Sequence, residues 1–150
     1  KSFDATKLLW RGSRDGFNAQ TFHKHCDKKG ATLTMIKSTN DWIFGGFNPS
    51  HWTSGGDYSN GRRAFLFTLT NPHGIKPTRY FCKDQDHAVY NLSDYGPTFG
   101  SGHDLTVWPG GSGTLSSYTH FPCSYTDTTG KGKATFIKTR HVKEIEVVAI

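Results

Sequence analysis

Apolar and polar side chains alternate with a period of two through much of this chain, which is typical of β-strands that bury one face. In residues 31–35 the apolar Leu33 and Met35 alternate with Thr32 and Thr34. This spacing predicts a half-buried strand whose apolar side chains point into a core. A turn at 38–41 and the apolar run 42–47 then predict a hairpin.

The same pattern predicts further strands along the chain. The run 64–70 is apolar on both faces, so we expect it to lie centrally in a sheet. Residues 79–83 and 87–92 flank Asp84-Gln-Asp86 and predict a second hairpin. Other strands are expected at 105–108, 136–138 and 142–150.

One segment near the start of the chain has the spacing of a helix instead. Apolar residues recur at helical intervals after Asn18, which is a suitable N-cap, and Gly30 is a suitable stop. We therefore predict one amphipathic helix over 18–29, with His23 and His25 on its exposed face.

The composition agrees with a strand-rich domain. The chain has 150 residues, enough for one domain with a substantial core, and aromatic residues make up 14% of it. Its 17 glycines indicate many turns and few long helices. We predict a single domain over 1–150 with a mainly β (α+β) fold. This fold is a two-sheet antiparallel β-sandwich with one main N-terminal helix and short flanking helices or turns.

The charge balance narrows the range of partners. Lysine and arginine number 18 against 12 acidic residues, a formal net charge of +6. These basic residues are dispersed rather than gathered in a block, so we do not expect nucleic-acid binding. No apolar run approaches the length of a membrane span. The 3 cysteines, Cys26, Cys82 and Cys123, allow either one disulfide with a free thiol or three buried thiols.

Several motifs occur together in a recognisable order. They are Leu8-Leu-Trp-Arg-Gly-Ser-Arg-Asp-Gly-Phe17, Phe44-Gly-Gly-Phe47, Ser54-Gly-Gly-Asp-Tyr58, Asn71-Pro-His-Gly74, Gly96-Pro-Thr-Phe-Gly-Ser-Gly-His-Asp-Leu105 and Val142-Lys-Glu-Ile-Glu-Val147. As a set, and over nearly the whole chain, they resemble the TLDc domain family.

The resemblance implies a β-sandwich with flanking helices and no known catalytic centre. It also implies a protein–protein interaction module, because intracellular members are linked to oxidative-stress protection and to binding of the vacuolar proton pump (V-ATPase). This chain is closer to the branch that carries Gly102-His-Asp-Leu105 than to those members. Many relatives have an Asn-rich loop after this motif, whereas this chain has Trp108-Pro-Gly-Gly-Ser-Gly113.

The stretch 95–108 combines the parts of a recognition site. Its glycines permit backbone angles that other residues resist, and His103 and Asp104 supply polar groups. Trp108 begins a glycine-rich loop, where a ring can stack on the apolar face of a sugar while polar neighbours bond its hydroxyls. The alternative is that Trp108 folds back onto the sandwich as a lid.

A second polar loop, 48–61, adds candidates for ligand binding. They are Trp52, Asp57 and Tyr58. For Trp52 the resemblance favours a packing role.

A catalytic centre is not expected. Adjacent His103 and Asp104 on a strand point to opposite faces, so they do not form a relay, and no Gly-x-Ser-x-Gly elbow occurs. Aspartates do allow a site of oxygen ligands, and Asp84, Asp86 and Asp104 are the candidate calcium ligands. The alternative is that each of them is a turn former.

Two hypotheses of function follow, with a glycan or a protein as the ligand. The favoured one is a stand-alone, secreted, lectin-like carbohydrate-binding module, with calcium dependence left open. It is based on Trp108, the polar loops and the start of the chain at Lys1 rather than Met. The other is a cytoplasmic protein–protein interaction module of the TLDc type. In either case the last strand, if it lies at a sheet edge, could pair with its twin in a homodimer.

Overall fold

The computed structural model describes residues 7–111, 113–132, 136 and 141–150. The strands in these ranges are β1 (Leu8–Arg11), β2 (Thr32–Ser38), β3 (Ile43–Asn48), β4 (Asp57–Ser59), β5 (Phe65–Thr70), β6 (Thr78–Phe81), β7 (Val89–Asn91), β8 (Thr98–Phe99), β9 (Leu105–Gly111), β10 (Thr114–Tyr118) and β11 (Val142–Ala149). The helices are α1 (Gly12–Asp15), α2 (Ala19–Cys26) and the 3₁₀ helix η2 (Gln85–His87).

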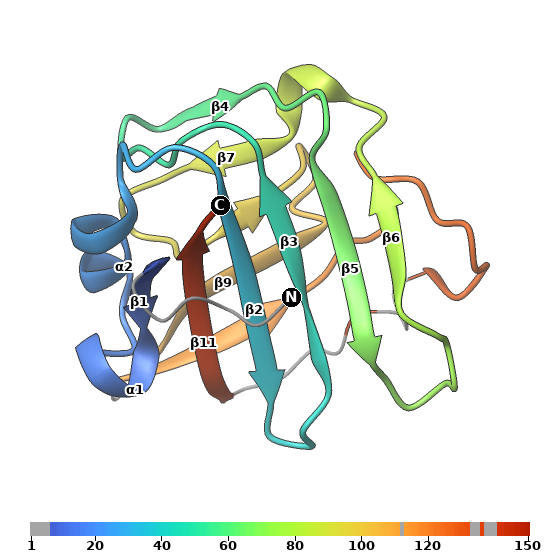
Figure 1. Ribbon diagram of the computed structural model, residues 1–150, viewed down its shortest axis with the longest axis horizontal. Helices are drawn as coiled ribbons and strands as arrows, with labels where there is room; N and C mark the ends of the chain where they lie inside the picture. Colours follow the sequence, from blue (N-terminus) through green and yellow to red (C-terminus); the bar gives the residue numbers. More distant parts are fainter. Residues whose placement is uncertain (1–6, 112, 133–135, 137–140) are drawn as a thin grey trace.

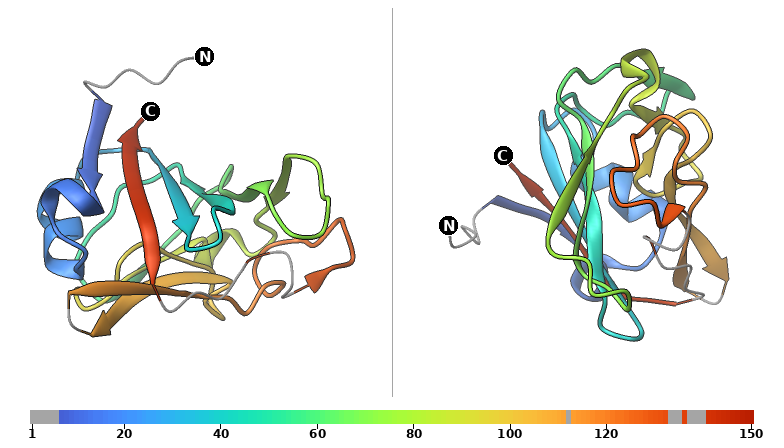
Figure 2. Two further views of the ribbon diagram at one scale, coloured as in Figure 1. Left: turned by 90° about the horizontal axis from the view of Figure 1, so that it is seen from below. Right: turned by 90° about the vertical axis from the view of Figure 1, so that its right-hand side faces the viewer.

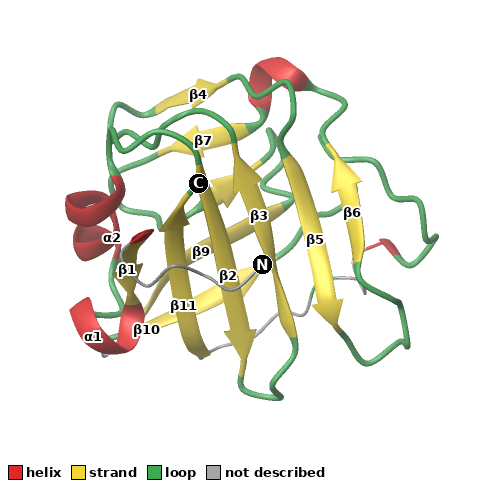
Figure 3. Ribbon diagram, in the orientation of Figure 1, coloured by secondary structure: helices red, strands yellow, loops and turns green. Residues whose placement is uncertain are grey.

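The strands form two antiparallel sheets that pack face to face (Figure 1). One sheet has six strands in the order β1-β11-β2-β3-β5-β6, and the other has five in the order β10-β9-β8-β7-β4. The right-hand view of Figure 2 shows the two layers edge-on. Helices α1 and α2 lie at one side of the sandwich (Figure 3), and strand makes up 42% of the structure against 13% helix. The predicted mainly β sandwich with its main helix near the N-terminus is confirmed.

Pairing within the six-stranded sheet confirms one predicted hairpin and corrects another prediction. β2 pairs with β3, and β5 has a neighbour on each side, as expected for the run 64–70. β11 lies between β1 and β2, so both of its edges are occupied. The last strand therefore does not lie at a sheet edge, which was the condition for its pairing with a twin. Of the strand predicted at 136–138, only Phe136 lies among the described residues, and it is buried.

The second predicted hairpin is also wrong. β6 pairs with β5 in the six-stranded sheet, with Arg79 opposite Phe67. β7 pairs with β4 in the other sheet, with Tyr90 opposite Tyr58. The η2 turn therefore carries the chain from one layer to the other rather than closing a hairpin. Two short strands with a turn between them look the same in sequence whether they pair with each other or with different sheets.

Aromatic rings fill the space between the sheets. Trp10, Phe22, Trp52 and Phe99 are fully buried. The ring centroid of Phe22 lies 5.3 Å from that of Trp10 and 5.3 Å from that of Trp52. The centroids of Trp52 and Phe99 are 5.5 Å apart. Rings of this size supply much of the buried apolar area that holds a domain of this length together.

Strand β2 is turned over relative to its predicted orientation. Thr32 and Thr34 point into the sandwich and are fully buried, whereas Leu33 and Met35 lie on the outer face of the sheet and are partly exposed. The Thr32 hydroxyl accepts a hydrogen bond of 2.9 Å from the indole nitrogen of Trp52. A buried indole N–H needs such a partner, which explains a threonine on the core side.

Helix α2 confirms the predicted N-cap, because the Asn18 side chain accepts a bond of 2.8 Å from the Thr21 backbone N–H. The helix ends at Cys26, earlier than the Gly30 stop predicted. The prediction of an exposed His23 is wrong. Its ring is buried, with Nδ1 2.7 Å from the Asp27 carboxylate and Nε2 bonded to the backbone carbonyls of Leu92 and Tyr95.

The cysteines follow neither predicted arrangement. All are free, Cys26 and Cys82 are buried, and Cys123 is exposed. Burial raises the pKa of the Cys82 thiol to about 11 and that of Cys26 above its ordinary range. In the described part of the chain, no helix combines the length and apolarity that a membrane span requires.

Candidate functional site

The outer face of the five-stranded sheet carries a continuous row of aromatic and imidazole rings, here called the ring strip. Successive ring centroids along the row lie between 4.6 Å and 6.2 Å apart. In spatial order its members are His87, Tyr58, Tyr90, His103, Tyr95, Trp108, Tyr118 and His120.

Strand alternation places these rings outward. Val89, Leu105 and Val107 point into the core and are fully buried, so Tyr90 and Trp108, which alternate with them, point to the other face. Beneath the strip the outward hydroxyls of Thr98 and Thr106 bond to each other at 2.7 Å and are fully buried. Neighbouring side chains on this face therefore cover them and leave the partly exposed rings as its surface.

His103 lies at the centre of the strip. Its backbone adopts the left-handed region with φ 56°, which directs the ring along the sheet face. The ring stacks on Tyr90 at 5.4 Å and meets Tyr95 edge-on at 5.9 Å. Burial, with His120 as the second cause, lowers the pKa of His103. The neutral imidazole, which offers one donor and one acceptor, is thus favoured near neutral pH.

The strip is tied to the turn that precedes β9 by two bonds. The Tyr58 hydroxyl donates to the Ser101 carbonyl at 3.2 Å, and His120 Nδ1 donates to the Gly102 carbonyl at 2.7 Å. These bonds join Tyr58 and His120, which lie on either side of His103 in the row, to the turn that holds His103. The rings therefore form one supported surface rather than separate mobile side chains.

Trp108 is partly exposed and lies within β9, paired with Ser116, so the prediction that it begins a loop is wrong. Its ring stacks on Tyr118 with centroids 5.4 Å apart and planes 20° apart, and contacts Tyr95 at 6.2 Å. The hairpin of β9 and β10 brings Trp108 and Tyr118 to the same face. Trp108, His103 and Tyr58, predicted separately as ligand-binding residues, thus lie in one surface. Asp57 neighbours Tyr58 on β4 and is exposed, but alternation turns its side chain away from the strip.

Asp104 is placed inside the protein rather than at the surface. Its carboxylate is fully buried and accepts backbone N–H bonds from Cys123, Ser124 and Tyr125 at 2.7, 2.9 and 3.1 Å. Burial raises the pKa of Asp104, and these N–H donors offset part of that effect. The geometry gives this residue a structural role in joining β9 to the segment after β10.

Trp52 is likewise in the core, as the packing alternative expected. The candidate calcium ligands are not brought together. Asp84 is held by the His87 ring at 3.0 Å, Asp86 is exposed on η2, and Asp104 is enclosed by backbone N–H groups. Over the described residues, no group of three or more His, Cys, Asp or Glu side chains is arranged to hold a metal ion.

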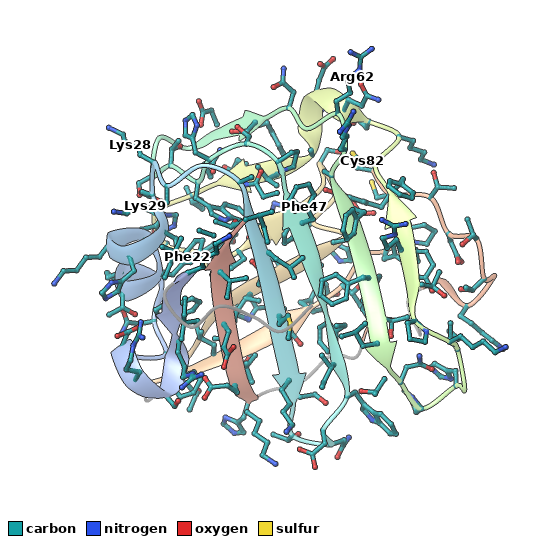
Figure 4. All side chains as sticks on the ribbon, in the orientation of Figure 1. Phe22, Lys28, Lys29, Phe47, Arg62 and Cys82 are labelled. Carbon is teal, nitrogen blue, oxygen red and sulfur yellow. The ribbon has the colours of Figure 1, made fainter. Side chains whose placement is uncertain are left out.

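Several members of the strip were missed in the sequence, namely Tyr90, Tyr95, Tyr118, His87 and His120. The available signal was an aromatic ring at the polar phase of a strand, as at Tyr118, which shares alternate positions of β10 with Thr114 and Ser116. Lys28 and Lys29 lie at one corner of the molecule and Arg62 at another (Figure 4).

The comparison with protein families agrees with the fold. The family model described as the TLDc domain matches residues 1–149. The chain belongs to the TLDc domain family. This membership points to a protein-interaction module. No curated protein matches the chain.

The TLDc motifs now have structural explanations. In Gly102-His-Asp-Leu105, a Cβ on the glycine would lie 2.6 Å from the Cys123 sulfur, so a larger residue requires the cysteine side chain to shift. Leu105 fills the core, Asp104 binds backbone N–H groups, and His103 alone reaches the surface. The motif therefore builds the turn on which the centre of the ring strip rests.

Proposed function

We propose that this TLDc domain is a non-catalytic interaction module that binds a protein ligand on the ring strip. The observation that carries the proposal is the unbroken row of partly exposed rings from His87 to His120. Tyrosine and tryptophan are the residues that most often dominate binding energy in protein interfaces. Each offers a large apolar surface at low entropic cost, together with a polar atom for a directed hydrogen bond.

The positions of His103 and Asp104 support the non-catalytic part of the proposal. The imidazole packs among tyrosines on the surface, while the carboxylate is occupied by backbone N–H groups inside. A histidine that acts as a general base needs a carboxylate or similar group to orient it, and these two side chains do not serve each other in that way.

The test measures binding to a defined protein with strip variants. The family resemblance suggests the purified peripheral sector of the vacuolar proton pump as the first probe. Proteins recovered by affinity capture on the 150-residue chain would be purified and tested in the same way. We expect Trp108→Ala and Tyr118→Ala each to weaken binding about tenfold or more, as residues at interface hot spots do.

Ile150→Ala is the matched control. This side chain is 65% exposed and follows β11 in the six-stranded sheet, away from the strip. Binding that is unchanged in both strip variants, or weakened equally by Ile150→Ala, would contradict the proposal. Thermal unfolding of every variant separates a lost contact from a lost fold.

Carbohydrate binding is the second candidate, and the stack of Trp108 on Tyr118 is the observation that favours it. A rigid pair of rings at the end of a hairpin can present an apolar plate to one face of a sugar. This candidate carries the predictions of a secreted protein and of calcium dependence. A glycan array run with calcium and with chelator tests the sugar binding and its calcium dependence, and the absence of any signal that Trp108→Ala removes would reject the candidate.

A further inference from the structure

The outer face of the six-stranded sheet is apolar, and no described helix covers it. Figure 1 looks onto this face, with α1 and α2 at its edge. Its side chains include Leu33, Met35, Phe47, Phe65, Phe67 and Phe81, from β2, β3, β5 and β6. Phe47, labelled in Figure 4, lies toward the upper end of β3. A contiguous apolar surface of this kind marks an interaction site.

A groove of about 440 Å³ lies in this face. Leu33 and Met35 form one wall, Phe65 and Phe67 another, and Arg79 lies at its end. Leu69 at 39% and Phe81 at 51% are among the most exposed large apolar side chains in the described part of the chain. The face thus presents both projections and a hollow, which a complementary surface can fill.

Strand register arranges the centre of the face as one row across the sheet. Glu146 on β11 lies opposite Met35, and Met35 opposite Gly45. Gly45 lies opposite Phe67, and Phe67 opposite Arg79 on β6. The row therefore has a carboxylate at one end, a guanidinium at the other, and a glycine in the middle.

This row is complementary to a copy of itself. A two-fold axis along β3 reverses the order of strands between two facing sheets, as in an isologous interface. Met35 of one copy then meets Phe67 of the other, a favourable sulfur–aromatic contact. Arg79 meets the partner's Glu146. At the axis Gly45 is buried, because the Phe67 ring lies over it, 3.0 Å from the position that a Cβ would take. Facing sheets with strands aligned within about 30° are a common packing.

Both charges are available for this contact. The Arg79 guanidinium lies 5.5 Å from the ring centroids of Phe65 and Phe81, and no described residue forms an ion pair with it. Glu146 Oε1 accepts bonds from Arg11, and no described side chain bonds to its Oε2. An arginine held over apolar rings gains most from a carboxylate when a partner excludes water.

We propose that a second copy of this chain docks on the outer face of the six-stranded sheet. The contact forms a two-fold dimer centred on β3. This inference is independent of the ligand of the ring strip. In the dimer the two ring strips lie on opposite outer surfaces, so the assembly is bivalent and gains avidity for a repeated ligand.

The first test is the mass of the chain in solution. Light scattering after size exclusion, over a concentration series from about 1 to 200 μM, should approach twice the 16.7 kDa of one chain. Phe81→Asp places a charge in the apolar face and should give a monomer. The matched control is Tyr58→Asp on the other sheet, at a ring 37% exposed, which should remain dimeric.

A wild-type chain that stays monomeric throughout the series overturns the proposal. So does a dimer that Tyr58→Asp disrupts as strongly as Phe81→Asp. Circular dichroism shows whether each variant is folded.

The second test uses charge reversal and does not depend on the Phe81 variant. In Arg79→Glu alone, and in Glu146→Arg alone, like charges face each other at both ends of the row, so each should dimerise at least tenfold more weakly. A mixture of the two variants restores opposite charges at both ends and should form a heterodimer. Failure of the mixture to associate, with both variants folded, would show that the row is not the interface.

Discussion

Asp104 Oδ1 accepts a hydrogen bond of 2.9 Å from the backbone N–H of Ser124, 20 residues further along the chain. Its second oxygen accepts from Cys123 and Tyr125. His103, the residue immediately before Asp104, lies at the centre of the ring strip. One buried carboxylate therefore holds together the turn before β9 and the segment after β10, the two connections that support the strip.

Replacement of Asp104 by alanine should lower the free energy of unfolding by about 3 kcal/mol or more, because it leaves buried N–H donors without an acceptor. Urea denaturation monitored by fluorescence measures the change. Asp94→Ala, at an exposed position, is the control and should fall within about 0.5 kcal/mol of wild type. Equal stability of the two variants would show that the Asp104 carboxylate does not stabilise the fold in this way.

Gly100 tests the same contact from the opposite side. A Cβ added there would lie 2.0 Å from Asp104 Oδ1, whereas one added at Gly56 would meet nothing within 4 Å. Both glycines have positive φ, +90° and +79°, so alanine is strained at each by about 1–2 kcal/mol. Gly100→Ala should be clearly the more destabilising of the two in thermal unfolding. Similar losses would mean that backbone strain alone explains both.

The ring strip should make stability depend on pH below neutrality. The folded state lowers the pKa of His103 from 6.5, so the unfolded chain binds the proton more tightly. Stability from this group is present above about pH 6.5 and is lost as pH falls through the lowered folded-state pKa. His103→Asn, which tolerates positive φ, should flatten the profile between pH 7 and 5 in urea titrations. An unchanged slope would assign the pH dependence to other groups.

His23 should control the mobility of the loop that carries Tyr95. Its Nε2 lies 2.9 Å and 2.8 Å from the carbonyl oxygens of Leu92 and Tyr95. His23→Ala removes these bonds and should cost about 1–3 kcal/mol. Relative to wild type, the variant should show faster amide hydrogen exchange in residues 92–96, and the increase there should be larger than in β2. Uniform exchange behaviour in both segments would show that the loop is held by other contacts.

The thiols should differ sharply in reactivity. Cys123 is exposed, whereas Cys26 and Cys82 are buried and their pKa values are raised by burial. In the native protein we expect a thiol reagent to modify Cys123 alone, and all 3 cysteines after unfolding in denaturant. Mass spectrometry of proteolytic peptides locates the modification. Loss of the native-state reaction in Cys123→Ser is the required control, and rapid native labelling of Cys82 would contradict the burial.

Much of the fold could be predicted because local patterns encode it. The period of two located β2 and β11, apolar runs located β3 and β5, and the cap at Asn18 located α2. What the pattern did not reveal is which face of β2 meets the other sheet. Thr32 faces inward because it accepts the Trp52 indole N–H, a contact between residues 20 positions apart that no local rule contains.

The candidate site shows the same division. Trp108, His103 and Tyr58 could be identified singly, from an aromatic in a glycine-rich loop, a polar pair and a polar loop. Their union into one surface depends on β4 pairing with β7 and on β9 lying between β8 and β10. Asp104 looked equally suited to ligand binding, and only its burial against Ser124 showed otherwise.

The sequence by itself determined the class of fold, the family and the positions of most strands, because hydrophobic periodicity, turn residues and motifs act over short distances. The tertiary structure decided which strands share a sheet, which ring faces solvent and which carboxylate is buried. Those outcomes depend on pairing between segments that are distant in the sequence. The local patterns are compatible with many such pairings, and the packing of the whole core decides which one forms. The motif Gly102-His-Asp-Leu105 illustrates both levels. It can be recognised in the sequence, but only the tertiary structure shows that its histidine lies at the surface while its aspartate and leucine are buried.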